Sequence, residues 1–428
     1  MGKKGNGEMK LNRYPKYKPT GIAWLPEVPE GWEVRKVRQL LTMVSRKGFP
    51  EKQLLSVTRE QGVVVRDVES KEENHNFIPD DLSNYKLVEV GDFVINKMKA
   101  WQGSYGVSAS EGIVSPAYYT CKLSGVDRRF FSVAIRSKAY VSFFAQLSKG
   151  IRVGQWDLSP MALKEIPFLF PPLATQQSIV AFLDEKCGKI DRWVAAKERE
   201  VALLKELKQA MIAEAVTRGF DHKVLNFSTG VFWQPLMPEG WCVKKCRHAL
   251  QKLNRSRPKD AELLVCTNKG TVNKRGDAKI GLVSEDETIY QGVAAGDLLI
   301  HGMDTWHGAI AVSELDGMCT PVVHVCDSKE NKKFVAFCFQ NMARGRLFKL
   351  ISNGVRQNTS DFRSWEKVAQ LPLVLPPRKE QDRIVSYIEA RAAKIDAAVA
   401  GLEREIAAMK EYKQRLIADV VTGQRKVA

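Results

Sequence analysis

The stretch GIAWLPEVPEGW at residues 21–32 returns as GVFWQPLMPEGW at residues 230–241, a shift of 209 residues. Farther along, the matches need a shift of 205, as between Gly91-Asp92 and Gly296-Asp297. A repeat of this length is a property of the architecture, so it decides how each local motif is interpreted. The 428 residues therefore predict two similar globular parts, each large enough to bury a core of its own.

Short apolar runs alternate with longer amphipathic stretches inside each globular part. Runs of three to five apolar or β-branched residues bounded by Gly-Asp or proline are typical of buried strands. Apolar residues at mixed spacings of three and four are typical of helices. The predicted strands are 93–95, 117–121, 298–300 and 322–326, and the predicted helices are 130–147 and 334–351. The predicted fold class is α+β.

A heptad pattern follows Pro171-Pro172 and returns after Pro376-Pro377. The first predicted seam is Leu183, Cys187, Ile190, Val194, Lys197, Val201, Leu204, Lys208, Met211 and Ala215. The second is Ile388, Ala392, Ile395, Val399, Leu402, Ile406, Met409, Lys413, Leu416 and Val420. Helices of about 40 residues extend roughly 60 Å, farther than the diameter of a domain of about 170 residues. We therefore expect the two helices to pack against each other.

Polar residues also repeat on these helices. Lys208 and Lys413 hold equivalent seam positions, where a lysine either sets the register of pairing or extends along the seam's edge into solvent. Other repeated polar residues are assigned to the outer face, where they are either solvated or dock a partner: Gln176-Gln177, Glu380-Gln381, 205–209 and 410–414.

The net charge of +17 favours a polyanionic partner. Its distribution is informative, because residues 1–172 carry +8 and residues 218–377 carry +6, whereas 173–217 are neutral and 378–428 carry +3. The alternative is a merely soluble basic protein. A basic excess on both globular parts favours a polyanion, and duplex DNA is the commonest partner with two-fold character.

Motifs of catalytic and cofactor sites are missing from the sequence. There is no phosphate-binding Gly-x-x-x-x-Gly-Lys-Ser/Thr loop, no Gly-x-Gly-x-x-Gly after a strand, and no Gly-x-Ser-x-Gly elbow. The pattern Cys242-x-x-x-Cys246-x-His248 imitates a zinc site, but its first-copy counterpart offers no zinc ligands. We therefore expect a non-catalytic chain without a metal or cofactor. The eight cysteines are scattered without a repeating frame, which favours reduced thiols and a location in the cytoplasm. No apolar run is long enough to span a membrane.

Two loops recur in each copy with side chains suited to DNA. One follows the Gly-Asp strand, at Asn96–Gly103 and His301–Gly308, and the other is Gly150–Asp157, matched by Gly354–Asp361. Arginine can bind guanine, glutamine and asparagine can bind adenine, and lysine can neutralise phosphate. For each residue the alternative is a solvated loop or a structural hydrogen bond, and Trp101 and Trp306 are interpreted as core anchors. The candidate DNA-binding residues are Lys97, Lys99, Gln102, Arg152, Gln155, Asp304, His307, Arg356, Gln357 and Asn358.

The chain resembles the specificity (S) subunits of type I restriction–modification enzymes. The resemblance rests on Tyr14-Pro-Lys-Tyr17 with the Trp/Pro segment after it, on Pro171-Pro172-Leu-Ala-Thr-Gln176-Gln177, and on the tail Ile417–Gly423. It implies two target recognition domains alternating with two helices that pack antiparallel. Each domain would read one half of a bipartite DNA site, and the helices would set the spacer.

The resemblance also implies partners and a division of labour. Two methyltransferase subunits would carry AdoMet, and nuclease subunits, if present, would use ATP and Mg. The implied arrangement is a basic arm at 1–20, recognition domains at 21–172 and 218–377, and helical spacers at 173–217 and 378–428. Two alternatives are an S-like coiled-coil scaffold or inhibitor that binds methyltransferase subunits without reading DNA, and an enzyme with an unrecognised site.

Overall fold

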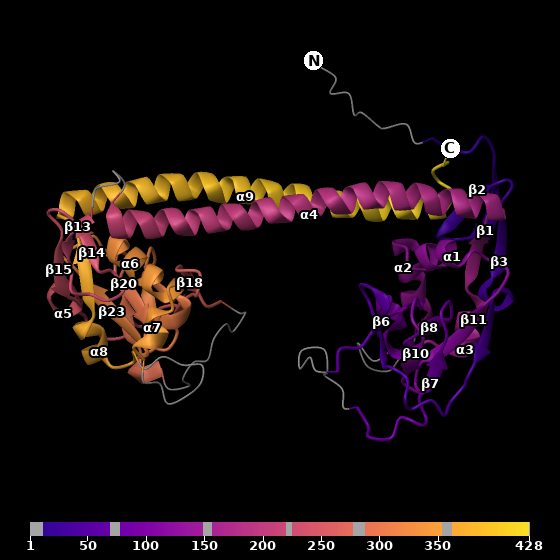
Figure 1. Cartoon of the computed structure of the whole chain (residues 1–428), viewed down its shortest axis with the longest axis horizontal. Coiled ribbons are helices and arrows are strands. Elements are labelled where there is room, and N and C mark those ends of the chain that lie inside the picture. The colour runs from indigo at the N-terminus through magenta and orange to yellow at the C-terminus, as the bar shows by residue number, and fades with distance from the viewer. Residues whose placement is uncertain are drawn as a thin grey trace, which may run out of the picture. The chain divides into compact units, whose positions relative to one another are not determined.

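The structure, a computed structural model, describes residues 12–68, 78–148, 156–219, 225–276, 287–352 and 362–427. The chain divides into two compact units. Unit 1 is Met1–Glu198 with Arg404–Ala428, and unit 2 is Arg199–Glu403. The part of unit 1 before the first long helix is called domain 1, and the part of unit 2 between the long helices is called domain 2 (Figure 1).

Domain 1 is built around an antiparallel four-stranded sheet in the order β4-β11-β8-β9, with four two-stranded pairs, β1-β2, β3-β12, β5-β6 and β7-β10. Its strands are β1 (Tyr17–Ile22), β2 (Leu25–Pro29), β3 (Glu33–Lys36), β4 (Leu41–Val44), β5 (Leu55–Thr58), β6 (Gly62–Val65), β7 (Lys86–Val88), β8 (Phe93–Ile95), β9 (Tyr105–Val107), β10 (Gly112–Val114), β11 (Tyr119–Leu123) and β12 (Pro167–Phe170). Its helices are η1 (Val37–Gln39), η2 (Lys97–Gln102), α1 (Arg128–Ile135), α2 (Lys138–Leu147) and α3 (Pro160–Glu165).

Domain 2 repeats this topology with the sheet order β16-β23-β20-β21. Its strands are β13 (Leu225–Ser228), β14 (Leu236–Pro238), β15 (Cys242–Lys245), β16 (Gln251–Lys252), β17 (Leu264–Cys266), β18 (Val272–Lys274), β19 (Gln291–Val293), β20 (Leu298–His301), β21 (Ile310–Val312), β22 (Gly317–Cys319), β23 (Val323–Asp327) and β24 (Pro372–Leu375). Its helices are α5 (Cys246–Ala249), η3 (Glu287–Ile289), η4 (Thr305–His307), α6 (Lys332–Arg344), α7 (Leu347–Leu350) and α8 (Trp365–Gln370). The predicted α+β class is therefore confirmed for both copies.

The repeated Gly-Asp pair makes the turn that precedes each central strand. Gly91 and Gly296 both have φ +92°, a left-handed conformation that glycine adopts without strain. The carboxylate of Asp92 accepts the backbone N–H of Glu89 at 2.9 Å, and Asp297 repeats this bond with Ala294 at 2.8 Å. Both aspartates are 4% exposed and each pairs with an arginine. The turn therefore aims β8 and β20 into the core.

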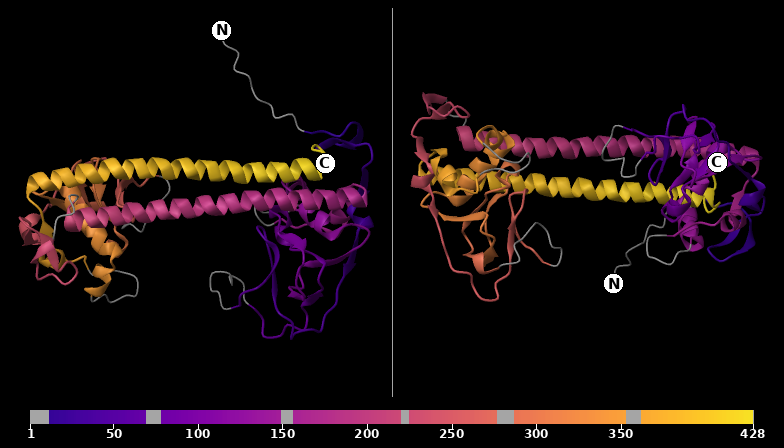
Figure 2. Two further views of the ribbon diagram at one scale, coloured as in Figure 1. Left: turned by 45° about the horizontal axis from the view of Figure 1, so that its top comes forward. Right: turned by 90° about the horizontal axis from the view of Figure 1, so that it is seen from below.

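The long helices α4 (Leu173–Arg218) and α9 (Arg378–Val421) pack antiparallel within each unit (Figures 1 and 2). Five residues of each predicted seam are buried: Leu183, Ile190, Val194, Val201, Ala215, Ile388, Val399, Ile406, Leu416 and Val420. The predicted coiled coil is confirmed. The long helices also pack against the domains. In unit 2, Ile212 of α4 and Ile388 of α9 are part of the buried core of domain 2.

Two details differ from the sequence-based interpretation. Gln176 and Gln381 are fully buried, so their assignment to the outer face was wrong. Strand β1 begins at Tyr17, inside the predicted arm of residues 1–20, whose first eleven residues lie outside the described ranges. Tyr17 is held there because its hydroxyl donates to the carbonyl of Gly423 at 2.8 Å.

Candidate nucleic-acid interface

The first predicted loop of domain 1 is the short 3-10 helix η2, which follows the buried strand β8 and packs on α2. Asn96 precedes it, and its side-chain amide donates to the Tyr118 hydroxyl at 3.1 Å. The loop ends at Gly103, whose φ of +92° turns the chain into β9. Lys99 is exposed and Gln102 is half-buried. Lys99 is thus the member of this loop best placed to meet a phosphate.

Lys97 has a structural partner. Its ammonium group donates to the Asp157 carboxylate at 2.9 Å, and this hydrogen bond raises the pKa of Lys97. The carbonyl of Lys97 also accepts the N–H of Leu158 at 3.1 Å, and the rings of Trp101 and Trp156 lie 4.9 Å apart. The end of the second predicted loop, with the residue after it, therefore packs against the first. Trp101 is a packing residue, as the sequence predicted.

A third segment, the β5–β6 turn, joins this surface, and sequence reasoning did not select it. The guanidinium of Arg136 donates to the carbonyls of Arg59 and Glu60 at 3.0 and 2.8 Å, and also to the carbonyl of Tyr105. Arg136 thereby clamps the turn onto the start of β9, while the Arg59 side chain remains 66% exposed. A Cβ added at Gly103 would lie 4.0 Å from Cγ of Arg59, so the turn and η2 are neighbours.

Domain 2 builds its first loop differently on the same frame. Asp304 precedes η4, and its backbone N–H donates to Nδ1 of His301 at 3.1 Å. Burial lowers the pKa of His301, although the attraction of Asp304 opposes the shift. His307 is exposed and Trp306 is partly buried against the core. Asp304 therefore shapes the loop, and His307 is the group directed to solvent.

The ends of the second loops are anchored by equivalent bonds in the two domains. In domain 1 the Tyr119 hydroxyl donates to the carbonyl of Leu158 at 3.1 Å. In domain 2 Nε2 of His324 lies 2.7 Å from the carbonyl of Phe362, and because a carbonyl only accepts, Nε2 carries the proton. Residues 149–155 and 353–361, which include the predicted Arg152, Gln155, Arg356, Gln357 and Asn358, lie outside the described residues.

The hairpin turn of domain 2 repeats that of domain 1 with other side chains. Gln340 takes the place of Arg136, and its amide donates to the carbonyl of Ile310 at 2.7 Å beneath Gly270. Asn268 and Lys269 at the tip are exposed. A small pocket is lined by Asn268, Lys269, Gly270, Trp306, His307, Gly308, Gln340, Ala343 and Arg344.

Each domain therefore presents a surface made by the 3-10 helix of the first predicted loop, a hairpin turn and the end of the second predicted loop. Its exposed groups include Arg59 and Lys99 in domain 1, and Lys269 and His307 in domain 2. Such groups can neutralise phosphates and donate hydrogen bonds to base edges. The signal that could have identified the turns is their glycine pair: Gly62 and Gly270 both have left-handed φ and both lie against the clamping side chain.

The described ranges contain neither a metal centre nor a membrane-spanning helix. No group of three or more His, Cys, Asp or Glu side chains there is arranged to hold a metal ion. No helix among the same residues is long and apolar enough to cross a bilayer.

The fold places the chain in a class of proteins with two similar α+β domains, in which each domain is followed by one long helix and the two helices pack antiparallel. Over 426 residues the chain is 20% identical to the type I restriction enzyme StySPI specificity subunit of Salmonella potsdam, covering 93% of this chain and 90% of that protein. The same identity and coverage hold for the EcoKI specificity subunit of Escherichia coli K12. No protein-family model matches the chain.

A solved structure shares the fold. It is described as the structural basis of complex assembly and conformational transition of the type I R-M system, and it matches with a TM-score of 0.69 at 12% identity. The match covers 94% of this chain and 99% of that one. The resemblance to type I restriction–modification specificity subunits is thus confirmed over most of the chain.

Proposed function

We propose that this chain is the DNA sequence-specificity subunit of a type I restriction–modification complex. In this proposal each domain reads one half of a bipartite DNA site, and the paired helices set the spacer. The observation that supports it most is the repeated frame with unlike polar groups. Lys99 and Gln102 in one copy stand where Asp304 and His307 stand in the other. Two equivalent frames that carry different side chains suit two different half-sites.

Two methyltransferase subunits are the proposed partners, together with restriction subunits where the system cleaves DNA. The helices support this, since each unit carries an apolar patch on them. In unit 1 a shallow hollow is lined by Trp193, Glu405, Ala408, Met409 and Tyr412. In unit 2 Leu203 and Leu207, equivalent to Ala408 and Tyr412, are 64% and 56% exposed. Exposed apolar patches of this kind mark protein interaction sites.

In the same proposal the chain performs no catalysis itself. Its methyltransferase partners would bind AdoMet and methylate adenine, and ATP and Mg would serve the restriction subunits. The complex would act in the cytoplasm of a prokaryotic cell, where its DNA substrate lies.

The test is to reconstitute the chain with methyltransferase subunits of a type I system and AdoMet, and to incubate the complex with a random-sequence duplex library. Single-molecule sequencing then detects methylated adenines. The expected result is one asymmetric bipartite motif with a spacer of constant length. A complex that assembles but modifies no such motif would contradict sequence reading and favour the scaffold or inhibitor alternative. Methyl transfer by this chain alone would contradict its non-catalytic role.

A further inference from the structure

One glutamine in each copy ties the domain to the long helix. Gln176 and Gln381 are the fourth residues of α4 and α9, lie 205 positions apart, and have no exposed surface. A buried amide must satisfy both its donor and its acceptor within the protein. These two amides do so with equivalent partners.

In unit 1 the Gln176 side chain connects three elements. Its Oε1 accepts the backbone N–H of Asp127 at 2.9 Å, and its Nε2 donates to the carbonyl of Pro171 at 2.8 Å. Asp127 is the N-cap of α1, since its carboxylate accepts the N–H of Phe130 at 2.8 Å. One amide thus connects the N-cap of α1, the residue after β12 and the first turn of α4.

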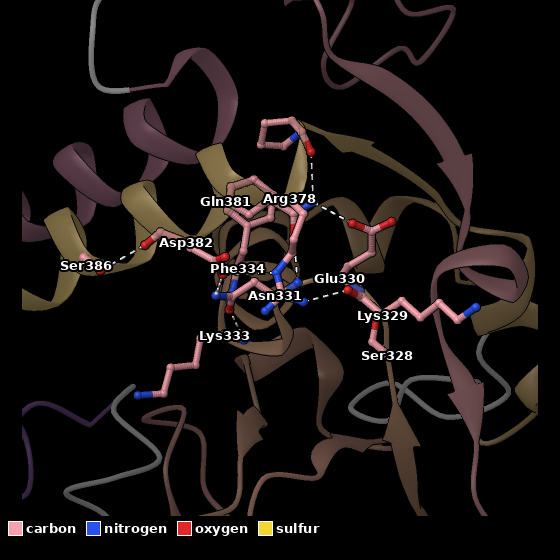
Figure 3. Close-up of polar contacts among 11 residues, drawn as sticks. Ser328, Lys329, Glu330, Asn331, Lys333, Phe334, Arg378, Gln381, Asp382 and Ser386 are labelled. Atoms are coloured by element: carbon pink, nitrogen blue, oxygen red, sulfur yellow. Dashed lines mark hydrogen bonds and ion pairs between the residues drawn. The ribbon is translucent and has the colours of Figure 1, made fainter.

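Unit 2 repeats the arrangement around Gln381 (Figure 3). Its Oε1 accepts the backbone N–H of Asn331 at 2.8 Å, and its Nε2 donates to the carbonyl of Pro376 at 2.9 Å. Asn331 is the N-cap of α6, where its side-chain oxygen accepts the N–H of Phe334 at 3.1 Å. The same three elements therefore meet at one side chain in both units.

The required chemistry is specific to glutamine. The N–H of the cap residue needs an acceptor and the proline carbonyl needs a donor, so the amide orientation is determined by its partners. Glutamate would place a carboxylate oxygen against the carbonyl, methionine would satisfy neither group, and asparagine is one methylene shorter.

The contact of domain 2 with α9 at Gln381, here called the second joint, has further polar contacts around the glutamine that the described residues around Gln176, the first joint, do not repeat. Nε2 of Gln381 also donates to Glu330 at 2.6 Å, and Lys244 pairs with Glu330 at 2.8 Å. Burial opposes ionisation of Glu330, but the hydrogen bonds from Lys244 and Gln381 outweigh it, so the pKa of Glu330 is lowered. Asn331 further donates to Asp382 at 2.7 Å. In the first copy Val126 and Gln177 stand at the positions of Glu330 and Asp382.

We propose that Gln176 and Gln381 are positioning residues, each of which fixes the angle between one domain and its long helix and so the spacer length that the protein accepts. This inference rests on the proposed function. Neither side chain is accessible to DNA, so neither reads bases. Loosening a joint changes where its domain can sit on the duplex and leaves the base preference of that domain intact.

The experiment compares Gln381→Met and Gln176→Met with the matched controls Lys379→Met and Gln177→Met, which change exposed residues of the same helical turns. Each full chain, in complex with methyltransferase subunits, is given DNA whose half-sites are separated by the native spacer or by one base pair more or less. The joint variants are expected to lose spacer selectivity by about tenfold, with unchanged base preference in both half-sites. Unchanged spacer selectivity, or altered base preference, would overturn the proposal.

A second measurement does not depend on DNA. Genetically encoded spin labels replace Lys259 in domain 2 and Lys394 on α9, both exposed and both in unit 2. The distance distribution between them is expected to broaden in Gln381→Met and to stay narrow in Lys379→Met. If the wild-type complex modifies no bipartite motif, the proposed function fails, while the joint is still judged by this distribution. A distribution as narrow as that of the wild type would reject the joint.

Discussion

The ammonium group of Lys208 lies 2.8 and 2.6 Å from the two carboxylate oxygens of Asp396 on the facing helix. In the other unit Lys413 lies 2.7 Å from both carboxylate oxygens of Asp191. The two pairs are the same contact of the repeat, since each residue of one lies 205 positions from its equivalent in the other. The ammonium groups thus reach the edge of the seam and pair there with carboxylates of the facing helix, a contact that fits both interpretations of a seam lysine, setting the register and extending along the seam's edge.

Reversing the charge of Lys208 should destabilise the helix pair, and a charge swap should restore it. Lys208→Glu would place a carboxylate against Asp396, and we expect the free energy of unfolding to fall by about 1 kcal/mol, since the pair is partly exposed. Adding Asp396→Lys should recover most of this loss. Thermal denaturation of the single and double variants measures the coupling. Additive effects would show that the pair does not set the register.

Acid should destabilise unit 2 in part through His324. Burial is the main reason that the pKa of His324 is lowered, and the hydrogen bond to the carbonyl of Phe362 opposes this shift. The unfolded chain therefore binds a proton first, and the free energy of unfolding should fall as the pH drops below about 6.5. The first copy has Tyr119 at this position, so His324→Tyr should keep the anchor bond and reduce the pH dependence.

Melting temperatures between about pH 7.5 and about pH 5.5 test this. His248→Ala, which removes an exposed imidazole, is the control. An equal pH slope in wild type and His324→Tyr would contradict the role of His324.

Removing Lys99 should weaken DNA binding without changing the preferred sequence. Lys99 is exposed on η2, where a phosphate contact contributes about one unit to the slope of log affinity against log salt. Fluorescence anisotropy of the reconstituted complex at several salt concentrations measures affinity and slope. Lys164→Ala on α3 changes another exposed lysine of the same domain and should leave both unchanged. A change in the modified sequence upon Lys99→Ala would assign base reading to this lysine instead.

Charges placed in the apolar patches should separate the chain from its partners. Tyr412→Glu and Leu207→Glu change equivalent positions on α9 and α4, outside the buried seam. Each is expected to reduce the number of methyltransferase subunits bound from two to one, and the double variant should bind none. Mass photometry of the assembled complexes counts the subunits. Binding of two subunits by the double variant would place the docking surface elsewhere.

Exchanging a whole domain should change one half-site. Replacing residues 21–172 with the corresponding segment of another specificity subunit should alter one half of the modified motif and leave the other half and the spacer in place. The methylation assay described above reads out all three. If both halves changed, the two domains would not read independently.

Much of the fold could be predicted because it follows from local pattern. The strands at 93–95 and 298–300 are where the apolar runs predicted them, and the predicted strands at 117–121 and 322–326 begin one or two residues later. The candidate DNA-binding residues remain a prediction, and the structure gives two of them local partners: Lys97 pairs with Asp157 at the end of the second predicted loop, and the backbone N–H of Asp304 donates to His301. The hairpin turns were missed because each depends on a side chain far away in the sequence, Arg136 or Gln340, and no sequence pattern shows which turn such a side chain contacts.

The duplication, the strand and helix content, and the heptad seam follow from residue order and spacing, because each depends on a pattern that can be recognised in the sequence. The burial of particular polar side chains follows instead from how the folded elements pack together. Gln176 and Gln381 have the composition of an outer face, yet each satisfies a backbone N–H 49 or 50 residues away and a carbonyl five residues away. A hydrogen bond between segments so far apart depends on how the domain packs against the helix, and that packing is a property of the whole fold.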